Sequence, residues 1–235
     1  MNKFLKSLGP GILFASTAIG VSHLVQSTRA GADYGFALLW AVILANVLKF
    51  PFFEYGARYA SATGESLIDG YKRIGLWMLL LYVGISLSSM FFVSAAVGAV
   101  TAGFMHQLFG LEHILSSQIS TAVIFVLCIA ILVLGRYKVL DRLIKVIGAV
   151  LLVSTLSAFV ISLWQGPKNY DFHFFEADVL NPSSSSFLFL IALMGWMPTA
   201  VDLSTWSSLW TIARAKESGY KPSLKETLNE FRFGY

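Results

Sequence analysis

The chain has 235 residues, of which 56% are hydrophobic and 13% are charged, with a mean hydropathy of +0.70 and a formal net charge of +4. A soluble domain carries about 25% charged residues, so this composition excludes a water-soluble globule and indicates an integral membrane protein. The single cysteine, Cys128, excludes a disulfide framework and a cysteine-based zinc cluster.

Six apolar stretches approach or exceed the roughly 20 residues that a helix needs to cross a bilayer. We therefore predict an all-α membrane protein with about six transmembrane helices, forming a single domain over residues 1–235. Strands are not expected, because the apolar runs lack the alternation that a closed barrel requires. The predicted spans are approximately residues 9–30, 36–60, 76–104, 115–134, 143–163 and 187–212.

The basic residues indicate how the chain is oriented. With the N-terminus inside, 14 of the 17 Lys and Arg residues fall on the inner side, Arg29 and Lys168 fall outside, and Lys49 lies within the second span. The positive-inside rule then predicts a multi-pass protein of the cell membrane, with the N-terminus and the C-terminal segment cytoplasmic. The 14 inner residues are Lys3, Lys6, Arg58, Lys72, Arg73, Arg136, Lys138, Arg142, Lys145, Arg214, Lys216, Lys221, Lys225 and Arg232.

The first and sixth spans differ from the other four in composition. The first opens with Gly9-Pro10-Gly11 and continues with small and polar residues, and the sixth carries Gly195 and Pro198 at its centre. Proline removes a backbone hydrogen bond, and helices interrupted at the midplane are how secondary transporters expose carbonyl groups to an ion. For one such span, a proline kink with close helix packing explains the pattern as well. Two such spans favour an ion path.

Several polar side chains lie inside the predicted spans. Asp202 stands out, because a carboxylate at the bilayer centre costs about 3 kcal/mol or more unless it meets a partner. A cation, a proton or Lys49 are the candidate partners, and a purely structural Asp202–Lys49 pair is the alternative. His23 is a candidate proton carrier or nitrogen ligand, or simply a hydrogen-bonding residue. Met194 and Met197 offer thioethers, which prefer transition metals, although methionine often only fills apolar space.

The second span adds two charges, Lys49 and Glu54. Glu54 is expected to reach the inner face beside Arg58, whereas Lys49 lies too deep and is a candidate counter-ion. The run NPSSSS before the sixth span is interpreted as a flexible connection. No phosphate-binding loop, nucleophile elbow, zinc-protease motif or dinucleotide fingerprint is present, so we expect no enzyme and no cofactor. The basic residues form no nucleic-acid surface.

Four stretches carry a resemblance to a known family. The segments GPGILF, TRAGADYGFALLWAVILAN and ARYASATGESL, together with ALMGWMPTAVDLS in the sixth span, resemble the NRAMP family of divalent metal transporters. The resemblance implies the LeuT-type fold: two inverted five-helix repeats with broken first and sixth helices around the ion. This chain would hold the first repeat and the first helix of the second. We therefore expect a truncated chain that acts with a missing C-terminal half or as a homo-oligomer.

The family's metal-binding motifs are altered in this chain. The DPGN motif of the first helix falls on Gly20, Val21, Ser22 and His23, so that its aspartate is replaced by glycine and its asparagine by histidine. In the sixth helix Met197 and Pro198 are retained, Thr199 stands where the family has histidine, and the backbone carbonyl ligand falls on Met194. We expect Asp202 to replace the lost charge. The resulting metal site consists of Gly20, His23, Met194, Met197 and Asp202, with Lys49, Glu54 and Thr199 as coupling or counter-ion residues.

These features lead to one expected function and two alternatives. We expect a secondary transporter of divalent metal ions such as manganese or iron in the lipid bilayer, with protons as candidate coupling ions. The first alternative is a carrier of organic solutes such as amino acids, in which free amides near Gly20 bind an anionic group. The second is a membrane sensor or assembly partner that has lost the site. Measurements of metal binding and of amino-acid binding distinguish these three functions.

Overall fold

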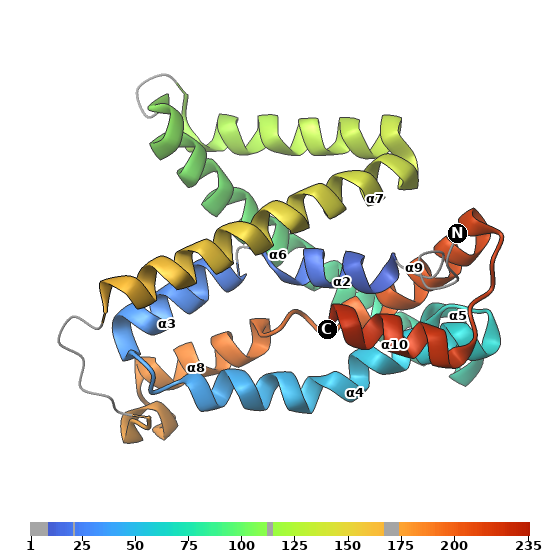
Figure 1. Ribbon diagram of the computed structural model, residues 1–235, viewed down its shortest axis with the longest axis horizontal. Coiled ribbons are helices and arrows are strands. Elements are labelled where there is room, and N and C mark those ends of the chain that lie inside the picture. Colours follow the sequence, from blue (N-terminus) through green and yellow to red (C-terminus); the bar gives the residue numbers. More distant parts are fainter. Residues whose placement is uncertain (1–8, 21, 112–114, 167–173) are drawn as a thin grey trace. The chain divides into compact units, whose positions relative to one another are not determined.

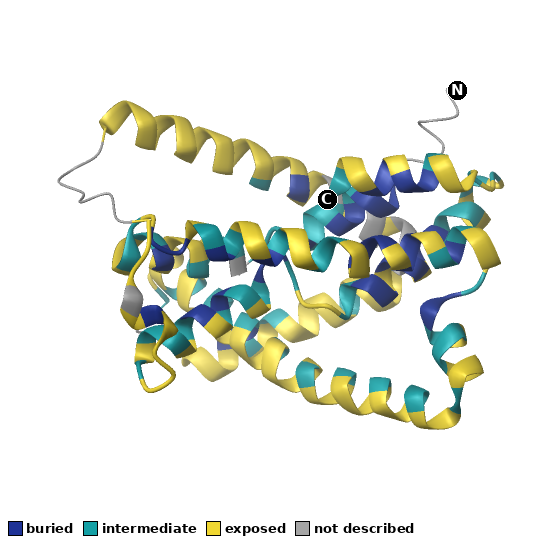
Figure 2. Ribbon diagram, turned by 90° about the horizontal axis from the view of Figure 1, so that it is seen from below, coloured by how far each residue is buried: buried dark blue, intermediate teal, exposed yellow. Residues whose placement is uncertain are grey.

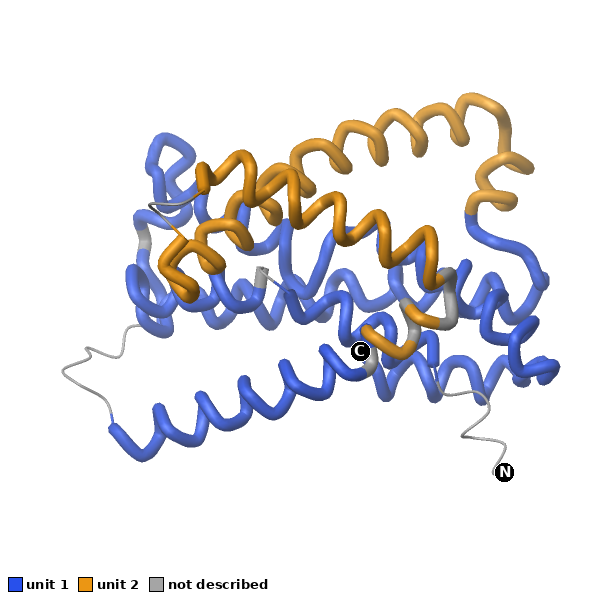
Figure 3. The backbone as a smooth tube through the Cα atoms, turned by 90° about the horizontal axis from the view of Figure 1, so that it is seen from above, with its two compact units in different colours: residues 1–67, 144–235 blue, residues 68–143 orange. Residues whose placement is uncertain are grey.

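The computed structural model describes residues 9–20, 22–111, 115–166 and 174–235; for residues 22, 136–138, 140, 141, 145 and 177 it describes the backbone alone. This part of the chain is helical and contains no strand, which confirms the all-α prediction. Two compact units are formed, one by residues 1–67 and 144–235 and one by residues 68–143 (Figure 3). The helices are α2 (Pro10–Ala18), η1 (Ser22–Gln26), α3 (Ser27–Tyr34), α4 (Leu39–Thr63), α5 (Leu67–Ile74), α6 (Leu76–Phe109), α7 (Ser117–Gln165), η3 (Ala177–Leu180), α8 (Ser185–Trp196), α9 (Leu203–Ser218) and α10 (Leu224–Gly234) (Figure 1).

The unit of residues 68–143 is built on α6 and the first part of α7. The two helices touch where Phe125 lies 2.9 Å from the position of a β-carbon on Gly98. His106 Nε2 and Ser120 Oγ are 2.7 Å apart and add a polar contact. Most other side chains face outward, and Phe92 is 77% exposed. Apolar surface of this extent is tolerated in lipid rather than in water, so these helices have the character of membrane spans.

Helix α7 covers both the fourth and the fifth predicted span, approximately residues 115–134 and 143–163. It is helical from Ser117 to Gln165, because residues 136–142 (RYKVLDR) contain neither glycine nor proline to end it. Its two apolar segments, Ser117–Gly135 and Arg142–Gln165, each have the length and composition of one span.

Three segments in the described part of the chain are long and apolar enough to cross a membrane, namely α6 and these two segments of α7. Helix α4 has 25 residues but carries Lys49 and Glu54. The first and sixth predicted spans are each divided into shorter helices. An apolar helical membrane protein is thus established, while the count of six crossings stays a prediction.

The unit that includes residues 1–67 is organised around α4, which contacts α8, α9 and α10. Buried residues concentrate on α2, α4, α9 and α10 (Figure 2). At one end of α4, Ala41 and Ala45 pack into an aliphatic cluster with Leu193 of α8. At the other end, Phe53 stacks edge-on with Phe14 of α2, 5.1 Å between ring centroids. Lys49 lies between these two clusters.

Helix α10 was not predicted from the sequence, from which this region is expected only to be a cytoplasmic C-terminal segment. Ser223 and Glu226 form a capping box at its start. The carboxylate of Glu230 accepts hydrogen bonds from the backbone N–H groups of Gly9 (2.9 Å) and Gly11 (2.8 Å) at the start of α2. Helix α10 therefore closes over the first turn of α2, and the free N–H groups there are satisfied by a carboxylate.

The connection before α8 is an ordered turn in the described residues 174–186. Ser184 accepts a hydrogen bond from the N–H of Phe187 and so caps α8. Its hydroxyl also donates to the carbonyl of Asp178 at 2.7 Å. The serines interpreted as a flexible connection thus serve as a helix cap and turn, which is the other common role of this residue type.

Candidate ion site at the interrupted helices

The first interruption separates α2 from η1. Helix α2 ends at Ala18, and Ile19 adopts an extended conformation with φ −75° and ψ 92°. A single π-helical turn then begins at Ser22, and such turns occur mostly at functional sites. The ring of His23 hydrogen bonds to the backbone carbonyl of Ala18, so a side chain satisfies a carbonyl that the end of α2 leaves free. The interruption predicted in the first span is confirmed.

The second interruption separates α8 from α9. Helix α8 ends at Trp196, Met197 is extended with φ −92° and ψ 135°, and α9 begins at Leu203. In a continuous helix the N–H of residue 198 would donate to the carbonyl of Met194. Pro198 has no N–H, so that carbonyl needs another donor. The interruption predicted in the sixth span is also confirmed.

Lys49 of α4 supplies the missing donor. Its Nζ donates to the carbonyl oxygens of Met194 at 2.8 Å and Gly195 at 2.7 Å, and lies 3.4 Å from the carbonyl oxygen of Thr199. The Met194 and Gly195 oxygens stand at the C-terminal end of α8, where the helix dipole favours a positive charge. We call the three carbonyl groups that surround this ammonium group the carbonyl nest.

Asp202 occupies the opposite end of the interruption. It precedes the first residue of α9 and is half-buried, at a helix end where the dipole favours a carboxylate. Among the described residues, no ion pair joins Asp202 to Lys49. The alternative of a structural Asp202–Lys49 pair is therefore wrong. Each charge instead lies at the helix end of opposite polarity.

The other predicted site residues lie around the same interruptions. The side chain of Met197 is 1% exposed and packs in the aliphatic cluster with Leu193 and Ala45. Met194 packs against that cluster as a partly buried residue, and its carbonyl faces Lys49. Gly20 lies at the first interruption, where its carbonyl accepts from the N–H of His23 at 3.1 Å. Within the described ranges no group of three or more His, Cys, Asp and Glu residues is placed to hold a metal ion.

Glu54 lies away from the interruptions, in contact with two arginines. Its side chain is 8% exposed and pairs with Arg58 one turn later and with Arg232 of α10, whose Nε lies 3.1 Å away. The predicted neighbourhood with Arg58 is confirmed, while Arg232 was missed because only the fold brings α10 to α4. Glu54 thus joins α4 to α10, and its partners give it a structural role in the described contacts.

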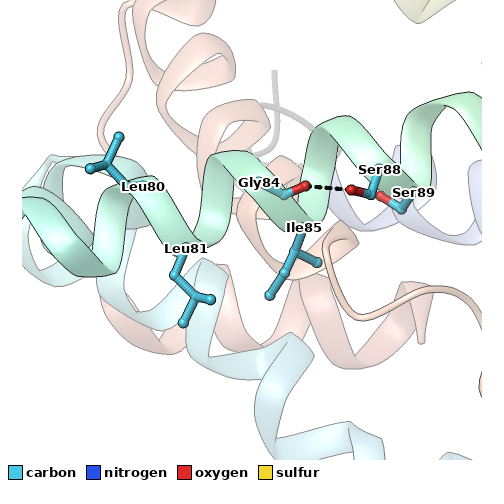
Figure 4. A pocket seen from close by; sticks show the side chains of 6 residues that line it. All are labelled: Leu80, Leu81, Gly84, Ile85, Ser88 and Ser89. Carbon is cyan, nitrogen blue, oxygen red and sulfur yellow. Dashed lines mark hydrogen bonds between the residues drawn. The ribbon is translucent and has the colours of Figure 1, made fainter.

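A separate hollow on α6 carries no comparable chemistry. It is lined by residues of that helix alone (Figure 4). Its polar contact is internal to the helix, from the hydroxyl of Ser88 to the carbonyl of Gly84 at 2.9 Å. The lining residues are Leu80, Leu81, Gly84, Ile85, Ser88 and Ser89.

Apolar helices of spanning length, together with two helices interrupted at polar groups, are typical of an integral membrane protein. Comparison with protein families then specifies the class. The model of the Nramp family, described as natural resistance-associated macrophage protein-like, matches residues 11–209. The chain belongs to this family, as the resemblance in the sequence implies.

Individual relatives agree with this assignment. The chain is 36% identical over 236 residues to an uncharacterized protein of Pasteurella multocida, covering 97% of this chain and 52% of that protein. It is 28% identical over 123 residues to the divalent metal cation transporter MntH of Bacillus subtilis, covering 49% of this chain and 28% of the transporter. The MntH of Chromohalobacter salexigens is 25% identical over 162 residues, covering 66% and 35%. The chain thus spans about half the length, or less, of these relatives. No solved structure matches it.

Proposed function

We propose that this chain forms the ion-binding part of a secondary transporter of divalent metal ions of the manganese and iron type. The observation that carries the proposal is the pair of interrupted helices, α2–η1 and α8–α9, in a chain of the Nramp family. The names of the MntH relatives support divalent metal ions as the substrate class. A LeuT-type repeat, six crossings and cytoplasmic ends are parts of the same proposal, as is coupling to protons.

The proposed ion site lies between the two interruptions. Asp202 supplies the negative charge, His23 a nitrogen ligand, and Met197 a thioether once its side chain has left the aliphatic cluster. Carbonyl oxygens near Gly20 and Met194 complete the set. Sulfur and nitrogen ligands favour softer divalent ions over magnesium, which prefers oxygen and retains water. Lys49, Thr199 and Glu54 stay candidates for coupling or charge compensation.

The test is metal titration by calorimetry on the purified, detergent-solubilised protein. We expect saturable manganese binding in the wild type and a loss of affinity of at least about tenfold in Asp202→Asn, since a charged ligand is removed. Asp33→Asn is the matched control, because Asp33 is an exposed carboxylate on α3. Magnesium and calcium titrations measure selectivity.

Each outcome assigns a different function. Manganese binding that Asp202→Asn abolishes and Asp33→Asn preserves supports the proposed site. Binding that neither substitution changes would place the metal elsewhere. Amino-acid binding without a metal requirement would select the organic-solute carrier, and binding of neither ligand would select a non-transporting membrane protein.

A further inference from the structure

The carbonyl nest at the end of α8 already holds a cation. The distances from Lys49 Nζ to the carbonyl oxygens of Met194 and Gly195, 2.8 and 2.7 Å, are those of charge-assisted hydrogen bonds. The 3.4 Å approach to the Thr199 carbonyl brings a third oxygen near the same ammonium group. Backbone carbonyl groups converging on one point are also what a metal ion uses as ligands. The nest therefore offers one cation position, which a side chain of the protein occupies.

We propose that Lys49 is the resident cation of the α8–α9 interruption and determines which ions bind there. A divalent metal ion uses the Met194 carbonyl only after the ammonium group has left it. This inference rests on the proposed function, because it identifies the group with which a metal ion competes. It assigns Lys49 a role different from that of a partner for Asp202.

Geometry and charge make the two cations mutually exclusive. A metal ion lies about 2.0–2.6 Å from a carbonyl ligand, so an ion on the Met194 oxygen would stand within a few ångströms of Nζ. Two positive charges this close repel strongly where little water separates them. Asp202 forms no ion pair with Lys49 that would offset this repulsion. A metal ion can therefore bind the Met194 carbonyl group at ligand distance, without strong repulsion, only when the ammonium group has moved away.

A purely structural role for Lys49 makes a different prediction. In that case the lysine only replaces the donor that Pro198 lacks, and its removal lowers stability without changing ion affinity. A resident cation affects ion affinity as well, because its departure leaves the same oxygens available to a metal ion. Affinity and stability must therefore be measured on the same variants.

Three substitutions separate charge from hydrogen bonding. Lys49→Gln keeps N–H donors for the carbonyl groups but removes the charge, and Lys49→Arg keeps the charge with more donors. Lys216→Met is the matched control, since it removes one positive charge from an exposed position near the end of α9. Manganese affinity is measured by calorimetry and the melting temperature by thermal unfolding, using the protein in detergent.

We expect Lys49→Gln to bind manganese at least about tenfold more tightly than the wild type, because the repulsive charge is gone. We expect Lys49→Arg to bind more weakly and Lys216→Met to bind unchanged. Equal affinity in the wild type and Lys49→Gln would overturn the inference and leave the proposed function standing. Binding by Lys49→Gln but not by the wild type would support the inference and count against native metal transport. Absence of binding in every variant would overturn both.

Folding of Lys49→Gln is checked by size exclusion and by its melting temperature. If that variant does not fold, Lys49→Arg carries the test. A manganese affinity weaker than that of the wild type then supports a resident cation at the nest. An unchanged affinity rejects it.

Discussion

Replacing Gly56 with alanine tests the close packing of α4 against α9. A β-carbon on Gly56 would lie 2.0 Å from the carbonyl oxygen of Ser204, whereas ordinary contact begins at 3.4 Å, a shortfall of 1.4 Å (3.4 minus 2.0). Overpacking of this kind costs about 1–3 kcal/mol, while alanine is preferred to glycine inside a helix by about 1 kcal/mol. Because the obstacle is backbone and cannot rotate away, the cost lies in the upper part of this range, about 2–3 kcal/mol, and we expect a net loss of unfolding free energy of about 1–2 kcal/mol.

Thermal unfolding in detergent, followed by tryptophan fluorescence, measures this loss. For a chain of this size the melting temperature falls by about 2–4 °C for each kcal/mol, so Gly56→Ala should melt about 2–8 °C below the wild type. Gly84→Ala is the control, because Gly84 is also helical and has nothing within 4 Å of the added carbon. We expect its melting temperature to stay unchanged or rise. An increase for both variants would refute the close contact between α4 and α9.

Two further substitutions examine the attachment of α10. Burial raises the pKa of the Glu230 carboxyl above its ordinary value, so the stability that this group contributes is largest below that value and decreases as the pH rises through the raised pKa. The melting temperature of the wild type should therefore fall relative to that of Glu230→Gln as the pH rises above 4.5, the ordinary pKa of a glutamate carboxyl, and parallel curves would contradict this. Tyr235→Phe removes the hydrogen bond from the hydroxyl to the Asn46 carbonyl, 2.6 Å long. Tyr235→Phe should lower the free energy of unfolding by about 1 kcal/mol, which thermal unfolding measures. An unchanged melting temperature would show that this bond does not hold α10.

Local chemistry made the interruptions predictable from the sequence. Pro198 lacks an N–H in any fold, and Gly20 weakens a helix wherever it lies within one. The fourth and fifth predicted spans correspond to two apolar segments of α7, Ser117–Gly135 and Arg142–Gln165, although the backbone between them stays helical. Charged residues mark the position at which a chain leaves the bilayer, but they do not end a helix unless glycine, proline or a cap accompanies them.

Partners distant in the sequence could not be predicted in the same way. The loss of a donor at the Met194 carbonyl follows from Pro198, but the identity of the replacement depends on how α4 packs against α8. Lys49 was therefore paired with Asp202 on charge alone. Likewise, Ser223 and Glu226 form a capping-box pattern that is visible in the sequence and marks the start of α10. Nothing local shows that Glu230 of that helix meets the first turn of α2.

The two interruptions share a feature that bears on how an ion enters. At the end of α2 the free carbonyl of Ala18 is bound by the ring of His23, and at the end of α8 the carbonyl of Met194 is bound by Lys49. Both are basic side chains placed where the helix dipole is negative, and the Met194 oxygen is one that a metal ion would bind in the proposed site. Since a buried carbonyl group left without a partner is costly in lipid, these side chains stabilise the interruptions as long as no ion is bound. In the proposed site, a metal ion that displaces Lys49 would satisfy the Met194 oxygen in its place. Exchange of Lys49 for an ion would therefore leave the Met194 carbonyl group paired in both states.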